Sequence, residues 1–188
     1  MFKLNFGSAH DVLGLGWKNV DAIDWEGNTD IIWDMKNFPY PFETESADEI
    51  RCVECLEHLS WRITEKILGE FYRILKKGGK VHIQVPDCGK AMEYYVKQQV
   101  CECVFHKPKS DEEKRGDPDC VKCSGAGRIN PTRWLLSFVG AQKHGYDAHL
   151  NIFTESILKK NLINAGFSGI NFHPDNCGWK LKATAKKI

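Results

Sequence analysis

The chain has 188 residues, 42% of them hydrophobic, which favours a single domain with a substantial core and room for one insert. It carries 26 basic and 25 acidic residues, and a net charge of +1 gives no general support for binding nucleic acid or an anionic membrane. No apolar run approaches the length of a membrane span, and Met1 to Lys3 lead directly into an expected strand. We therefore expect a cytoplasmic protein without a signal peptide.

The N-terminal third of the chain alternates short apolar runs with polar turns, a pattern typical of strands. Few residues separate Gly7 from Trp17, whereas a parallel crossover normally takes about a dozen residues and usually contains a helix. The first connecting helix is therefore expected to be one turn long or absent. The strands of this region are predicted at about 3–6, 18–22, 30–34 and 48–54.

The rest of the chain contains longer helical patterns. Apolar residues repeat at helical spacing over 62–76, and Gly78-Gly79 follows as a stop signal. Thr154 is expected to cap the last helix and Gly166 to end it. The further elements predicted are a strand at 80–85, helices at 91–100, 132–139 and 154–165, and a hairpin of strands at 168–173 and 178–185.

Small and acidic residues follow the first strands at the points where a ligand would bind. The first strand ends in Gly7-Ser8-Ala9, which lets the backbone approach a ligand closely. Asp21 ends the second strand, where it can hold two ribose hydroxyls, and Asp34 follows the third, where it can accept from an adenine amine. These points converge at the carboxyl ends of a parallel sheet. The layout predicts a site for an adenosine-bearing cofactor.

In their order and spacing, these segments resemble the small class I S-adenosylmethionine-dependent methyltransferases. The resemblance implies a Rossmann-like α/β fold, with a mostly parallel seven-stranded sheet and a terminal antiparallel hairpin. The family's cofactor loop usually reads Gly-x-Gly, and here Ala9 is the third residue; alanine fits at negative φ but cannot adopt positive φ cheaply. The segments that carry the resemblance are 4–9, 16–21, 38–42, 47–50, 56–59, 71–87, 153–156 and 162–167.

The resemblance also implies a function and a cofactor site. The function is transfer of a methyl group from S-adenosylmethionine to an oxygen or nitrogen of an unidentified acceptor, most simply a small molecule or a glycan. Such an enzyme mainly aligns the nucleophile and removes its proton. The cofactor residues implied are Phe6, Gly7, Ser8 and Ala9 at the methionyl part, Asp21 at the ribose, Asp34 and Met35 at the adenine, and Val53 and Glu54 near the sulfonium.

Residues 101–128 interrupt the expected methyltransferase domain, which comprises residues 1–100 and 129–188. This insert is polar and charged, so it needs a source of order other than a core. Four thiolates around one structural zinc ion would supply that order and leave no position for a substrate. Residues 120–127 resemble a Cys-x-x-Cys-x-Gly-x-Gly knuckle of the chaperone zinc domains, whereas the Cys-x-Cys half departs from it. The ligands predicted are Cys101, Cys103, Cys120 and Cys123, with His106 as an alternative to one of them; four reduced thiols in a loop are the other possibility.

A second Cys-x-x-Cys spacing is formed by Cys52 and Cys55. Cys52 lies inside an expected strand, where side chains alternate between faces, so positions three apart point in opposite directions until the strand ends. We therefore expect two separate free thiols in the core.

A second metal site is suggested by Glu54-Cys55-Leu56-Glu57-His58. In a helical turn, Glu54, Glu57 and His58 would share one face. The pattern resembles the metal-binding turn of small-RNA terminal 2′-O-methyltransferases and of quinone-pathway O-methyltransferases, in which a divalent cation such as Mg²⁺ or Mn²⁺ activates one of two vicinal hydroxyls. His149 or His144 would complete such a site. The alternative is that Glu57 and His58 make structural hydrogen bonds.

Two other classes of function stay open at this point. The altered glycine loop, the missing helix and the insert are also compatible with an inactive binding module that recruits a partner through its zinc knuckle. A nucleic-acid methylase is the third possibility. The near-neutral charge does not support it, and the Asn/Asp-Pro-Pro-Tyr signature of exocyclic-amine methylases is absent after the fourth strand.

Overall fold

The computed structural model describes residues 1–97, 136, 138–143, 146–175 and 178–188. The predicted zinc insert lies outside the described residues, as do His144, the loop cysteine Cys177 and most of the helix predicted at 132–139. Among the described helices, none is long and apolar enough to cross a membrane.

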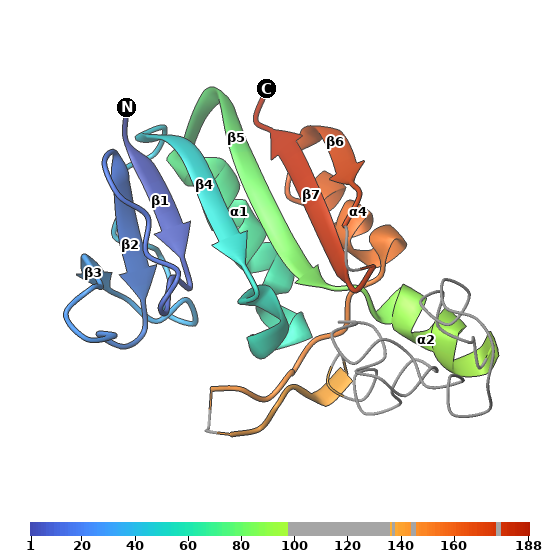
Figure 1. The fold of residues 1–188 in the computed structure, drawn as a ribbon. Coiled ribbons are helices and arrows are strands. Elements are labelled where there is room, and N and C mark those ends of the chain that lie inside the picture. Colours follow the sequence, from blue (N-terminus) through green and yellow to red (C-terminus); the bar gives the residue numbers. More distant parts are fainter. Residues whose placement is uncertain (98–135, 137, 144–145, 176–177) are drawn as a thin grey trace, which may run out of the picture.

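Seven strands form one sheet in the order β3-β2-β1-β4-β5-β7-β6 (Figure 1). All neighbouring pairs from β3 to β5 are parallel, and β7 is antiparallel to both β5 and β6. This arrangement confirms the predicted mostly parallel sheet with a terminal antiparallel hairpin. The strands are β1 (Lys3–Phe6), β2 (Trp17–Asp21), β3 (Ile31–Ile32), β4 (Ala47–Val53), β5 (Leu75–Pro86), β6 (Ser168–His173) and β7 (Lys180–Lys186).

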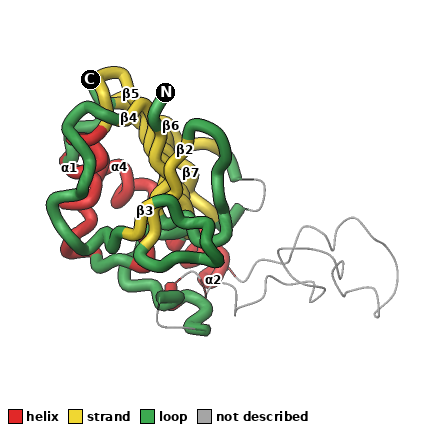
Figure 2. The backbone as a smooth tube through the Cα atoms, turned by 90° about the vertical axis from the view of Figure 1, so that its left-hand side faces the viewer, coloured by secondary structure: helices red, strands yellow, loops and turns green. Residues whose placement is uncertain are grey.

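Helices α1 (Thr64–Ile74) and α4 (Glu155–Asn164) lie on the same face of the sheet, as Figures 1 and 2 both show. Two 3₁₀ turns, η1 (Leu56–His58) and η2 (Trp61–Ile63), lead from β4 into α1, and α2 (Cys88–Lys97) follows β5. The Thr154 side chain caps α4 by accepting from the Ile157 N–H, as predicted. The largest fully buried side chains between these helices and the sheet are Phe6, Ile50, Ile67, Phe71, Phe153, Leu158 and Leu162.

No helix connects β1 with β2, in agreement with the short spacing between them. Buried asparagines hold the connecting loop instead. Asn5 Nδ2 donates to the Asp11 carbonyl at 2.8 Å, and Asn19 exchanges two 3.0 Å hydrogen bonds with the backbone of Leu13. Arg51 on β4 then binds both the Asn5 side chain and the Asp11 carboxylate. Side chains thus make the hydrogen bonds to the loop backbone that the backbone of a helix would make within itself.

Candidate functional site

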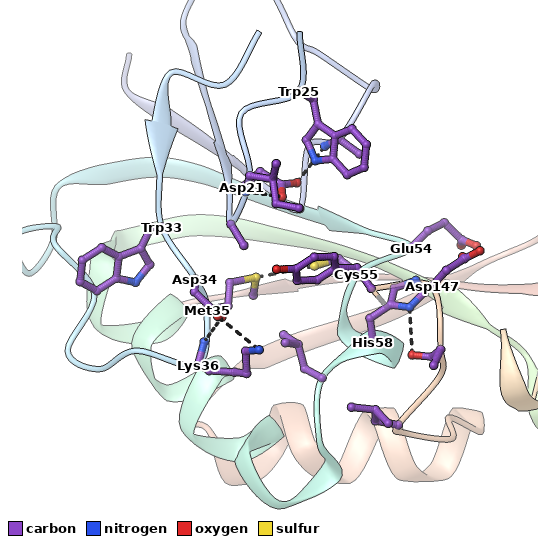
Figure 3. A pocket seen from close by; sticks show the side chains of 18 of the residues that line it. Asp21, Trp25, Trp33, Asp34, Met35, Lys36, Glu54, Cys55, His58 and Asp147 are labelled. Carbon is purple, nitrogen blue, oxygen red and sulfur yellow. Dashed lines mark hydrogen bonds and ion pairs between the residues drawn. The ribbon is translucent and has the colours of Figure 1, made fainter. Parts of the chain in front are cut away.

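A cavity of about 420 Å³ lies at the carboxyl ends of the first strands (Figure 3), within the size range of small-molecule and cofactor sites. Five segments that are distant in sequence form its walls. The lining residues are Gly7, Ala9 and His10, then Asp21, Ala22, Ile23 and Trp25, then Trp33 to Lys36, then Glu54, Cys55, His58 and Leu59, and finally Tyr146 to Ala148 and Leu150.

The loop after β1 approaches the cavity with two residues in the left-handed region. Gly7 has φ 64°, and a Cβ there would lie 2.5 Å from the Cys55 Cβ and closer still to its Sγ, so only glycine fits. Ala9 has φ 38°, which costs an alanine energy. The Ala9 N–H donates to Asp21 Oδ2 at 2.9 Å. Asp21 therefore ties the end of β2 to this loop at the cavity wall.

Asp34 and Met35 form the opposite end of the cavity (Figure 3). The Asp34 carboxylate accepts from the Lys36 N–H at 2.9 Å and pairs with the Lys36 ammonium at 3.2 Å. The backbone at Met35 is held by the buried Tyr40, whose hydroxyl donates to the Met35 carbonyl at 2.9 Å. This end therefore offers an acid, a cation and an apolar side chain on a fixed turn.

Glu57, His58 and His149 come together beside the cavity. Their nearest carboxylate and imidazole atoms all lie within 4.8 Å of one another, and the His58 and His149 ring centroids are 4.9 Å apart. The Glu57 carbonyl brings the late loop to this point, because it accepts from the N–H groups of Leu150 and Asn151. A contact across about 90 residues of chain thus supplies the second histidine.

Burial governs the protonation of these groups. Glu57 is 1% exposed, and burial, reinforced by the nearby Glu54 carboxylate, raises the pKa of the Glu57 carboxyl well above its usual value. Its Oε2 has no hydrogen-bond partner among the described residues. Burial lowers the pKa of His58, and the His58 Nδ1 lies 3.3 Å from the Ala148 carbonyl. A neutral His58 whose Nδ1–H donates to that carbonyl keeps a lone pair on Nε2.

Glu54 does not join this group, contrary to the expectation that it would share a face with Glu57 and His58. It precedes η1, has φ 50°, and its Oε1 accepts from Gln84 Nε2 at 3.0 Å. Its other oxygen is 3.5 Å from the Lys180 ammonium. The helical turn on which the expectation depended is a 3₁₀ turn that starts only at Leu56, so the i to i+4 face does not form.

Comparison with known proteins gives one partial family match. Residues 24–83 match the model of the methyltransferase domain family. A search of curated proteins finds no relative of the chain by sequence. Several solved structures, however, share its sheet and helices over nearly the whole chain.

A candidate O-methyltransferase from Nostoc punctiforme has a TM-score of 0.59 at 14% identity, over 98% of this chain and 51% of its own. A candidate S-adenosylmethionine-dependent methyltransferase from Listeria monocytogenes has a TM-score of 0.59 at 12% identity, over 100% of this chain and 91% of its own. Human N-acetylserotonin methyltransferase in complex with SAM has a TM-score of 0.52 at 15% identity, over 99% of this chain and 47% of its own. This is the Rossmann-like methyltransferase fold. The chain spans about half the length of two of these three proteins.

Within this methyltransferase fold, most of the cofactor residues expected from the sequence line the cavity, namely Gly7, Ala9, Asp21, Asp34, Met35 and Glu54. Three others do not. Phe6 is buried in the core against Phe71, and Val53 is half-buried on β4. Ser8 is 1% exposed, and its hydroxyl has no partner among the described residues.

Sequence reasoning missed the aromatic walls of this cavity. Trp25 and Trp33 line it on either side of β3, and His10 packs edge-on against Trp25 at 4.9 Å between ring centroids. One signal was available, because two tryptophans flank a short strand that an acid, Asp34, follows. Aromatic rings in such positions provide stacking surfaces for planar ligands.

Proposed function

We propose that the protein transfers a methyl group from S-adenosylmethionine to an oxygen or nitrogen nucleophile. One observation carries the proposal: a single cavity at the carboxyl ends of the strands combines the Gly7 loop with Asp21 and Asp34. In a Rossmann-like methyltransferase fold, this is the edge of the sheet at which a ligand is expected. Matches to solved S-adenosylmethionine-dependent methyltransferases support it.

The cavity residues fit the parts of this cofactor. The Gly7 and Ala9 loop lines the cavity where the methionyl part would lie, and Asp21 presents a carboxylate for the ribose hydroxyls. Asp34 and Met35 suit the adenine amine and ring. When bound, the cofactor supplies a methyl group on a sulfonium whose positive charge already activates the leaving group. The chain then needs to orient the acceptor, exclude water and take a proton.

His58 is the residue best placed to take that proton. It lines the cavity, burial favours its neutral form, and a bond from Nδ1–H to the Ala148 carbonyl would leave Nε2 as a base. Positioning of the acceptor falls to the adjacent wall of Tyr146, Asp147 and Leu150. We propose a small molecule or a glycan as the acceptor class, because a cavity of about 420 Å³ is of the size of small-molecule sites.

Calorimetric titration with S-adenosylhomocysteine tests the cofactor site. We expect binding by the unmodified protein and a loss of at least tenfold in affinity for Asp21→Ala, because the ribose would lose its carboxylate partner. Asp24→Ala is the matched control, since Asp24 lies three residues away and does not line the cavity. Absence of binding at millimolar ligand would refute the enzyme and favour an inactive binding module.

The grouping of Glu57, His58 and His149 favours a second candidate, methyl transfer to vicinal hydroxyls assisted by a divalent cation. One carboxylate and two imidazoles suit Mn²⁺ and similar ions, and the unpartnered Glu57 Oε2 would gain a partner. A bound cation would act as a Lewis acid on an acceptor hydroxyl. Titration with Mn²⁺, followed by electron paramagnetic resonance, should show binding that Glu57→Gln and His149→Ala weaken. Glu54→Gln should leave Mn²⁺ binding unchanged. If Glu54→Gln abolished Mn²⁺ binding while Glu57→Gln and His149→Ala did not, the site would not be the group of Glu57, His58 and His149.

We also propose a structural zinc ion held by Cys101, Cys103, Cys120 and Cys123. The support comes from the spacing of these residues in a segment with little apolar content. Elemental analysis of the purified protein should find about one zinc per chain. A protein that folds and binds cofactor with no zinc would refute this part of the proposal without affecting the methyltransferase site.

A further inference from the structure

Two sulfur atoms meet at the wall of the cavity, and we call them the sulfur cluster: Met35 Sδ and Cys55 Sγ. The Cys55 Sγ is 3.6 Å from the Met35 Sδ, and Figure 3 shows the two side chains side by side. Cys55 and its neighbour Cys52 are both free, so neither is in a disulfide.

Cys55 reaches the cavity wall because the strand ends before it. β4 ends at Val53, Glu54 adopts φ 50°, and Cys55 precedes η1 with φ −135° and ψ −44°. Cys52, inside β4, belongs to the buried core, whereas Cys55 packs against that core and lines the cavity. Both cysteines are free, so the expectation of free core thiols is confirmed.

Access to the sulfur cluster is from the cavity. Cys55 is half-buried and lines the cavity together with Met35, whereas Cys52 is 1% exposed behind them. Gly7 packs directly against the Cys55 side chain, which fills the place that a Cβ at Gly7 would take. A small ion reaches the two sulfurs from the cavity that Met35 and Cys55 both line.

We propose that the sulfur cluster is a binding site for a soft monovalent cation, Cu(I). Thiolate and thioether ligands together select Cu(I) over harder ions. Two metal–sulfur bonds of about 2.3 Å would subtend about 100° across the 3.6 Å separation of Met35 and Cys55, a workable angle for two ligands of one ion. Among the described residues, the one cluster of three or more His, Cys, Asp or Glu ligands is Glu57, His58 and His149, and it contains neither Cys52 nor Cys55.

The location predicts competition with the adenosyl cofactor. Met35 and Cys55 line the same cavity as Asp21 and Asp34. An ion bound between the two sulfurs would displace the Met35 side chain, which is the proposed contact of the adenine ring. This consequence rests on the proposed function, whereas binding of Cu(I) itself does not.

The three methionines of the chain make a direct test possible, because ¹³C-methyl labelling gives one NMR signal each for Met1, Met35 and Met92. Met1 and Met92 are exposed and lie outside the sulfur cluster. The full-length protein is titrated with Cu(I) under anaerobic conditions until all eight cysteines can be saturated. We expect the Met35 signal to shift and the other two to stay in place. A Met35 signal that never moves would overturn the proposal.

Matched variants assign the ligands. Cys55→Ser should abolish the Met35 shift, and Cys88→Ser, which removes a buried thiol elsewhere, should preserve it. Met35→Leu keeps all cysteines and should weaken the Cu(I) affinity at this site at least tenfold in competition with a chromophoric chelator. An unchanged Met35 shift in Cys55→Ser would overturn the assignment. Saturating S-adenosylhomocysteine should suppress the shift; failure of that ligand to bind at all would count against the cofactor site and not against Cu(I) binding.

Discussion

The close approach of Gly7 to Cys55 predicts a large and separable effect of Gly7→Ala. A left-handed φ costs a non-glycine residue about 1–2 kcal/mol, and Gly7 has φ 64°. The new methyl group would overlap the Cys55 side chain, and overpacking costs about 1–3 kcal/mol. Alanine also has fewer conformations than glycine in the unfolded chain, which offsets about 0.4–1 kcal/mol of this loss of stability. We therefore expect the free energy of unfolding to fall by about 3 kcal/mol.

Urea unfolding measures this change, and a second substitution separates its two causes. In a Cys55→Gly background the new methyl group no longer overlaps a side chain, and only the cost of the left-handed backbone stays. Gly7→Ala should then lower the free energy of unfolding by about 1 kcal/mol. The difference between the two backgrounds is a coupling energy of about 2 kcal/mol between the two sites. Gly14→Ala is the matched control, because Gly14 lies in the same loop and a methyl group added there would meet no atom within 4 Å. Equal costs of Gly7→Ala in both backgrounds would refute the packing argument.

Three further predictions concern the loop, the insert and the buried acid. Arg51→Ala should destabilise the protein by about 1–2 kcal/mol and weaken S-adenosylhomocysteine binding, since the β1–β2 loop loses an anchor; the exposed Arg62→Ala should do neither. Cys120→Ser should lower the zinc content and speed proteolysis of residues 101–128, and an unchanged zinc content would contradict the proposed ligand. The pKa of Glu57 is raised by folding, so in metal-free protein stability should decline as pH rises above about 4.5. Glu57→Gln should flatten that decline in urea midpoints measured from pH 4 to 8, and an identical slope would show that Glu57 is not its source.

The sheet and the first connection could be predicted from the sequence because the signals are local. Alternation and turn residues indicate where the strands lie. The end of α1 was less well predicted, because the helix ends at Ile74 and not at the Gly78-Gly79 stop signal. There Leu75 is already extended and pairs with Ala47, so sheet formation ends the helix before the glycines do. The positions of Asp21 and Asp34 follow from the same logic, since residues at the carboxyl ends of parallel strands must share one edge.

Several features of the site depend on backbone conformations that composition does not reveal. Ala9 and Glu54 both adopt positive φ, which is unfavourable for any residue with a Cβ and is tolerated only where surrounding structure over-determines it. The Glu54 carboxylate pairs with Gln84 and Lys180 and stays out of the group with Glu57. A local pattern of residue types could not predict this result.

The sequence by itself determined where the strands lie, that no long helix follows the first strand, and which acids follow the strand ends. These features depend on periodicity and chain length over a few residues. Only the tertiary structure decided which groups meet. His149 reaches Glu57 and His58 through backbone hydrogen bonds from the late loop, and Met35 reaches Cys55 from a different strand end. Such contacts join residues 20 to 90 positions apart, and they form only when the packed sheet brings its carboxyl edge and the late loop together.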